Sequence, residues 1–153
     1  MYADALRAYS PQNEQEDADR RMILEYIRRF PDNILTRDNA IAHMTSSGFV
    51  VNADASKVLM AHHNLSRVWA WTGGHADGEA DLLAVALREA REETGAEHVR
   101  PLSAQIASVD ILPVWGHVKG GRYVCAHQHL NVSYLLWPMK PIRSGPGRGG
   151  IPG

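Results

Sequence analysis

The chain of 153 residues has little of what several protein classes require. Its single cysteine, Cys125, cannot form an internal disulfide, which is typical of a protein in a reducing compartment. No apolar run approaches the roughly 20 residues that a membrane-spanning helix needs. The polar N-terminus lacks the apolar segment of a secretory signal. We therefore expect a cytoplasmic protein with no membrane partner.

An excess of charge of one sign is also missing. Sixteen Lys and Arg stand against seventeen Asp and Glu, for a net charge of -1. This balance argues against binding nucleic acid through bulk positive charge. The acids are unevenly placed, because Asp110 is the only one after Glu97. Any chemistry that needs several carboxylates must therefore be carried by residues before position 98.

The N-terminal part of the sequence has the residue pattern of helices. A composition with 44% hydrophobic and 22% charged residues is typical of one globular domain. Apolar residues recur at three- and four-residue spacing from Asp17 to Phe30, which predicts an amphipathic helix that Pro31 ends. A second, short helix is expected over Thr36–His43. We treat residues 1–44 as a helical extension packed on the main domain.

A longer helix is predicted over Asp81–Thr94, which contains no Gly or Pro and is rich in strong helix formers. Asp81 is suited to cap its N-terminus, and Gly95 is suited to end it in a left-handed conformation. The stripe expected to face the core consists of Leu83, Ala86, Leu87 and Ala90.

The remaining segments predict strands and a tail. Short apolar or β-branched runs favour strands over 106–114 and 123–137, and a hairpin whose arms are 48–51 and 57–60. The last residues, 138–153, hold four of the eight prolines and five of the thirteen glycines, which predicts a flexible tail.

Three glutamates share one face of the helix predicted over 81–94. Glu89 lies three residues before Glu92 and four before Glu93, so their carboxylates are neighbours on the helix surface. Like charges at this spacing destabilise a helix by roughly 0.2–0.5 kcal/mol per pair, and the helix C-terminus disfavours anions. A divalent cation would reverse this effect, because Mg²⁺ and Mn²⁺ bind hard carboxylate oxygens. A solvated acidic face partly screened by Arg88 and Arg91 is the simpler interpretation of the same pattern.

Two adjacent glycines, Gly73 and Gly74, precede this helix, and this glycine pair together with the three glutamates favours the metal site. Together, the glycine loop and the helix over residues 74–96 resemble the signature of the Nudix hydrolases. Counted from Gly74, the positions that match that signature are Arg88, Glu89, Ala90, Glu92, Glu93, Gly95 and Ala96. One position departs, because Ala80 stands where the signature has a glutamate that chiefly supports the loop, and Glu79 and Asp81 flank it.

The resemblance implies a fold, a reaction and a set of residues. The fold would be an α/β/α sandwich with a mixed sheet, over residues 45–137, here without the family's closing C-terminal helix. The reaction would be metal-dependent hydrolysis of a nucleoside diphosphate linked to another moiety, with Mg²⁺ or Mn²⁺ as cofactor. The metal ligands would be Glu89, Glu92, Glu93 and the Gly73 carbonyl, with Arg88 orienting the glutamates, and Glu89 or Glu92 taking the proton from the attacking water.

Weaker signals remain open. Cys125, His127 and His129 alternate along a predicted strand and should point to one face. That pattern suits zinc, but no fourth ligand accompanies it at a recognisable spacing, and a strand that lines the substrate site is the favoured interpretation. Trp69 and Trp71 precede the glycine pair and are expected in the core rather than stacked on a base.

Two functions from different classes are consistent with the sequence. The first is an active pyrophosphohydrolase, and the second is a catalytically weak protein of the same fold that binds a nucleotide. The second is supported by the lack of an acid after Asp110 and by the Pro/Gly tail. If no helix covers the strand ending at Trp137, its apolar edge would be exposed, and we expect a homodimer or aggregation at high concentration.

Overall fold

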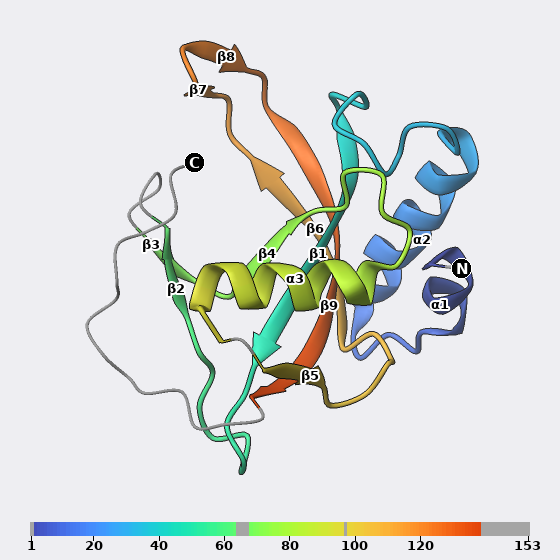
Figure 1. Cartoon of the computed structure of the whole chain (residues 1–153). Helices are drawn as coiled ribbons and strands as arrows, with labels where there is room; N and C mark the ends of the chain where they lie inside the picture. Colours follow the sequence, from blue (N-terminus) through green and yellow to red (C-terminus); the bar gives the residue numbers. More distant parts are fainter. Residues whose placement is uncertain (1, 64–67, 97, 139–153) are drawn as a thin grey trace.

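A mixed sheet of five strands forms the centre of the protein (Figure 1). The computed structural model describes residues 2–63, 68–96 and 98–138. Three helices accompany the strands, two of them N-terminal. The elements in chain order are α1 (Tyr2–Ala8), α2 (Glu14–Arg29), β1 (Ala42–Val50), β2 (Ala61–His63), β3 (Val68–Ala70), β4 (Thr72–His75), α3 (Leu82–Thr94), β5 (Val99–Pro101), β6 (Ser108–Val114), β7 (His117–Lys119), β8 (Arg122–Val124) and β9 (His127–Pro138).

β1 and β9 are the two central strands. They pair in parallel over all nine residues of β1, from Ala42 opposite Gln128 to Val50 opposite Leu136. β4 pairs antiparallel with the other edge of β1, while β5 and β6 pair antiparallel with the other edge of β9. The sheet is therefore mixed, as predicted.

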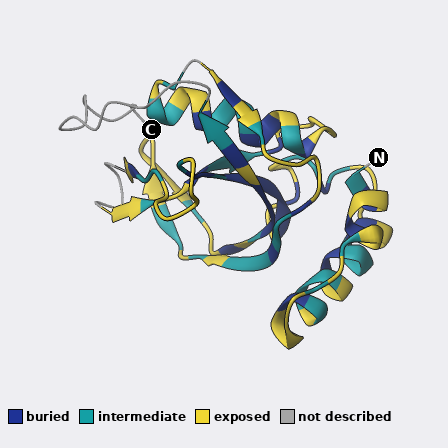
Figure 2. Cartoon of the chain, turned by 90° about the horizontal axis from the view of Figure 1, so that it is seen from below, coloured by how far each residue is buried: buried dark blue, intermediate teal, exposed yellow. Residues whose placement is uncertain are grey.

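The two faces of this sheet differ in chemistry. On one face, apolar residues of β1, β6 and β9 join buried side chains of all three helices in a single core cluster that contains Leu6, Ile23, Met44, Ala90 and Leu130. Residues that alternate with these along a strand must point to the opposite face. That face is polar although it is mostly buried (Figure 2), and it carries His43, Thr45, Ser47, His129, Asn131 and Ser133.

α3 lies across the sheet in Figure 1 and has the ends that the sequence predicts. The Asp81 side chain accepts a hydrogen bond from the Ala84 amide at 3.0 Å, and Gly95 ends the helix with φ 68°. Ala86 is buried as predicted, and so is Ala90, but Leu83 and Leu87 are only half-buried. The fully buried leucine and valine are Leu82 and Val85. The core-facing stripe thus keeps Ala86 and Ala90 but continues through Leu82 and Val85 instead of Leu83 and Leu87.

α2 confirms the predicted N-terminal helix and begins three residues earlier than Asp17. The earlier start is explained by Asn13, whose side chain accepts a hydrogen bond from the Glu16 amide at 2.9 Å and caps the helix. Ile23 and Ile27 face the core, whereas Met22 is exposed.

The helix predicted over Thr36–His43 is wrong. These residues form turns, and β1 begins at Ala42. Short polar side chains satisfy the backbone locally: the Asn39 side chain accepts from the Ala42 amide at 3.2 Å, and the Thr36 hydroxyl donates to the Asn33 carbonyl. Such bonds compete with helix formation.

The hairpin predicted around residues 52–56 is correct only in its turn. Val51 and Val58 form an isolated bridge rather than a pair of long strands. The Asn52 amide donates to the Lys57 carbonyl at 3.1 Å across the turn. The segment predicted as the first arm instead belongs mainly to β1, which has β4 and β9 as partners.

The C-terminal strands correct one further expectation. The segment predicted as one strand over 123–137 is two strands, β8 and β9, and β8 pairs with β7 in a projecting hairpin. The outer edge of β9 is covered, because β5 pairs with it opposite Leu136 and Trp137, whereas the side chain of Leu135 is 37% exposed. Residues 139–153, predicted to be flexible, lie outside the described residues. No helix follows β9 within the described part of the chain, and no described helix is long and apolar enough to cross a membrane.

Candidate functional site

The glycine pair lies in β4, between β1 and α3. A side chain at either glycine would collide with a neighbour: a Cβ at Gly73 would meet the Ser47 hydroxyl, and a Cβ at Gly74 would overlap the carboxylate of Glu89. The backbone of β4 and the first glutamate of the helix are therefore closer together than any residue with a side chain would allow. This contact joins the two halves of the sequence signature in space.

Two of the three predicted glutamates meet this strand. Glu89 is only 18% exposed, and its Oε1 forms an ion pair with Arg88 Nη2 at 2.9 Å. Glu93 Oε2 accepts a hydrogen bond from the Gly73 amide at 3.1 Å. Glu92 lies on the same helix and is exposed. Carboxylate oxygens of this kind are the ligands that Mg²⁺ and Mn²⁺ prefer, so the donor chemistry fits a hard divalent cation.

The loop after β4 is held without a glutamate at position 80. Arg37 forms a bidentate ion pair with Asp77, at 2.8 and 2.6 Å, and lowers the pKa of that carboxyl. Asp77 and Gly78 both have positive φ, and the Gly78 amide donates to the Leu35 carbonyl at 2.9 Å. Arg37 and Leu35, which precede β1, thus hold the loop after β4. In the family signature a glutamate at position 80 supports this loop.

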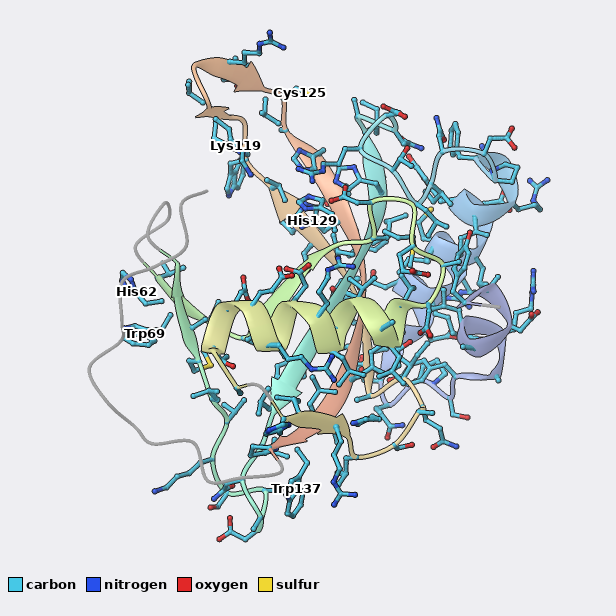
Figure 3. All side chains as sticks on the ribbon, viewed as in Figure 1. His62, Trp69, Lys119, Cys125, His129 and Trp137 are labelled. Atoms are coloured by element: carbon cyan, nitrogen blue, oxygen red, sulfur yellow. The ribbon has the colours of Figure 1, made fainter. Side chains whose placement is uncertain are left out.

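A cluster of four histidines lies on the polar face of the sheet, on β4 and the neighbouring strands β1 and β9. It consists of His43 on β1, His75 on β4, and His127 and His129 on β9. One ligand atom from each lies within 4.8 Å of the others, and the Nε2 atoms of His127 and His129 are 3.2 Å apart. Figure 3 labels His129 on β9. Within the described residues these four are the group of His, Cys, Asp or Glu close enough to share one ion.

Burial favours the neutral form of three of these histidines. Desolvation lowers the pKa of His75 to about 4 and that of His129 to about 3, with the positive charge of Arg37 acting in the same direction. Burial also lowers the pKa of His43. Neutral imidazoles at ordinary pH are what metal coordination requires.

The sequence found only part of this cluster. His127 and His129 share a face as predicted, but Cys125 precedes β9, is exposed and is not among the residues whose ligand atoms cluster; Figure 3 shows it apart from His129. The sequence missed His43 and His75. His75 follows the glycine pair directly, which was a usable signal. His43 could not be placed while its segment was predicted as helix.

The two tryptophans before the glycine pair are not core residues. Trp69 is 61% exposed and Trp71 is 37% exposed, so the expected burial is wrong. Trp69 contacts His62 across the β2–β3 pair, with ring centroids 5.2 Å apart (Figure 3), and Trp71 contacts Phe49 at 5.3 Å.

Comparison with known proteins decides the family. The NUDIX domain model matches residues 42–130, from the start of β1 into β9, and the match includes the glycine pair and α3. The chain belongs to the Nudix family. Nudix proteins are mostly hydrolases that act on pyrophosphate bonds, and they typically use divalent metals. No curated protein matches the chain.

Proposed function

We propose that this Nudix protein hydrolyses the pyrophosphate bond of a nucleoside diphosphate linked to another moiety, with Mg²⁺ or Mn²⁺. The observation that carries the proposal is the contact between the glycine strand and α3, where Gly74 leaves room for the Glu89 carboxylate and the Gly73 amide holds Glu93. Carboxylates fixed at the edge of a strand that exposes its backbone suit the binding of a cation and a phosphate together.

The residues of the chain have separable roles in this proposal. Glu89, Glu92, Glu93 and the Gly73 carbonyl would hold the ion, whose chemistry is to offset the charge of the pyrophosphate and to acidify the attacking water. Arg88 fixes the Glu89 carboxylate through their ion pair. Glu89 or Glu92 accepts the proton from the water. Glu92, which is exposed, is free of the steric restriction that holds Glu89 against Gly74.

A substrate panel tests the proposal. Nucleoside diphosphate sugars and related compounds would be incubated with the full chain, with Mg²⁺ or with a chelator, and an added phosphatase would convert the product monoesters to measurable phosphate. We expect turnover of at least one compound, lost on chelation and lost in Glu92→Gln but kept in Glu14→Gln, a surface change on α2. Saturable nucleotide binding with no turnover of any compound would instead identify a catalytically weak nucleotide-binding protein.

A further inference from the structure

We propose that His43, His75, His127 and His129 form a second metal site, which binds one divalent transition-metal ion, with Zn²⁺ as the best fit. This site is distinct from the carboxylate site, and the inference does not depend on the proposed hydrolysis. The four side chains come from three strands that are neighbours in the sheet, so only the fold brings them together.

The spacing of the imidazoles suits a small ion. Two ligand nitrogens around a tetrahedral Zn²⁺ are about 3.3 Å apart when each Zn–N bond is about 2.0–2.1 Å. The Nε2 atoms of His127 and His129 are 3.2 Å apart, and the whole set lies within 4.8 Å. The ring centroid of His43 lies 5.0–5.4 Å from those of the other three, and the ring centroid of His129 lies 4.8–5.4 Å from them. On binding an ion, the wider pairs of ligand atoms would have to close from as much as 4.8 Å toward about 3.3 Å.

Hydrogen bonds to backbone carbonyls fix the ring nitrogens in the form that ligands need. His43 Nδ1 lies 2.9 Å from the Asn39 carbonyl oxygen, and His127 Nδ1 lies 2.9 Å from the Cys125 carbonyl oxygen. A carbonyl can only accept, so both Nδ1 atoms carry the hydrogen, which leaves Nε2 of each ring as the atom that can offer a lone pair to an ion. Metal-binding histidines in proteins usually have this second contact, because it orients the ring and sets its tautomer.

One of these lone pairs has no partner. His43 is 4% exposed, and its Nε2 is buried without a hydrogen bond. An unsatisfied buried acceptor is costly, and each such atom requires an explanation. No neighbouring ring donates to this nitrogen in the structure, and His129 Nε2 lies within hydrogen-bond distance of His127 Nε2 instead. A cation bound among the four rings would give the Nε2 lone pairs of His43 and His127 a partner, and would also bind His129 Nε2 once the His129 hydrogen has moved to Nδ1 in the other neutral tautomer.

The donor set separates this site from the carboxylate site. Imidazole suits Zn²⁺ and neighbouring transition metals, whereas Mg²⁺ prefers carboxylate and water oxygens. Charges of both signs surround the cluster, with Asp77 opposing the positive charges of Arg37 and Lys119. Four protein ligands leave no open position on a tetrahedral ion, which is typical of a structural site. A bound ion would tie β1, β4 and β9 together next to the glycine pair.

Zinc binding in excess Mg²⁺ is the direct test. Metal-free full-length protein would be titrated with Zn²⁺ by calorimetry while Mg²⁺ occupies the carboxylate site. We expect one Zn²⁺ per chain and a rise in Tm on loading. Affinity should fall at least tenfold in His75→Asn and in His129→Asn, and should be unchanged in His98→Asn, a surface histidine outside the cluster. Glu93→Gln should also bind one Zn²⁺. A wild-type chain that takes up no Zn²⁺ in excess Mg²⁺, or uptake that Glu93→Gln abolishes, would overturn the proposal.

A measurement on the wild type avoids any dependence on how the variants fold. X-ray absorption at the zinc edge of the loaded protein should show a nitrogen shell at about 2.0–2.1 Å with the outer scattering of imidazole rings. A shell of oxygens without ring scattering would place the ion elsewhere and contradict the histidine site.

Discussion

Adjacent residues of β4 face opposite sides of the sheet, and this alternation separates two kinds of ligand. Gly74 points toward α3, where its missing side chain admits the Glu89 carboxylate, whereas His75 belongs to the polar face with His43 and His129. The Glu89 carboxylate therefore lies on one side of the strand and the imidazoles lie on the other. Single substitutions can therefore alter the carboxylate site or the histidine cluster separately.

Glu93→Gln tests the carboxylate site. The change removes a charge that the proposed ion requires, so turnover should fall by about two orders of magnitude or more, the scale of one lost transition-state contact. The metal-free variant should be as stable as the wild type or more stable, because a like-charge pair with Glu89 is removed. Steady-state kinetics and urea unfolding in chelator measure both effects. Turnover close to that of the wild type would remove Glu93 from the proposed site.

Asp110 provides a pH test of the contact between α2 and β6. Burial raises the pKa of this carboxyl, and the negative charges of Glu16 and Asp19 add to the effect. A raised native pKa favours the protonated form, so that stabilisation is present below the ordinary pKa of the carboxyl and is lost as the pH rises through the native pKa. Asp110→Asn should therefore be more stable than the wild type at pH 7, with the difference shrinking toward pH 3.

Asp54 serves as the control for this test, because its pKa is shifted in the opposite direction to that of Asp110. Hydrogen bonds from Ser56 lower the pKa of Asp54 in the exposed turn, so Asp54→Asn should stabilise nothing at pH 7. Urea unfolding of each variant and the wild type at the same pH values measures the differences. An Asp110→Asn effect that is constant with pH would show that the ionisation of Asp110 does not affect folding.

At the scale of elements, α3 is the part that its own sequence specifies most completely. Asp81 caps it, Gly95 ends it and the interval contains strong helix formers, so local signals agree along its whole length. The strands are different, because β1 has a glycine, two serines and a histidine where a strand signal would have β-branched residues. Its conformation depends on pairing with β4 and β9.

Ala90→Phe tests how α3 packs on the sheet. Ala90 is fully buried, and a larger side chain there should overpack the core and cost about 1–3 kcal/mol of unfolding free energy. Ala84→Phe places the same side chain on the exposed face of the same helix and serves as the matched control. Thermal and urea unfolding would measure both. Equal stabilities of the two variants would mean that the helix faces the sheet through a different stripe.

At the scale of the whole molecule, the N-terminal helices contribute to the core of the sheet rather than standing apart from it. Leu6 on α1 is fully buried, and the Tyr9 hydroxyl that follows α1 donates to Glu16 at 2.7 Å. The matched family region begins only at residue 42, yet its core includes side chains from before it. Removal of the helices α1 and α2 should therefore destabilise the remainder.

Leu6→Ala tests this dependence. The lost side chain leaves a cavity in the shared core, so the free energy of unfolding should fall by about 2–5 kcal/mol. Met22→Ala on α2 removes an exposed side chain of similar size and should change stability by less than about 0.5 kcal/mol. A single unfolding transition with a shifted midpoint is expected for Leu6→Ala. Two transitions, with the second one unshifted, would show that the helices fold separately from the sheet.

The sequence by itself determined the features that depend on neighbours along the chain. These are α2, α3 with its two ends, the glycine pair and the spacing of Glu89 and Glu93, because helix periodicity and caps are local. The tertiary structure decided what depends on pairing between distant strands. The register of β1 with β9 sets His43 opposite His129, and β4 adds His75, at separations in the chain that no spacing rule connects. Pairing with β5 covers the end of β9. Pairing with β9 makes Ala42 and His43, which were predicted as helix, the start of β1, because backbone pairing with a neighbouring strand outweighs local propensity.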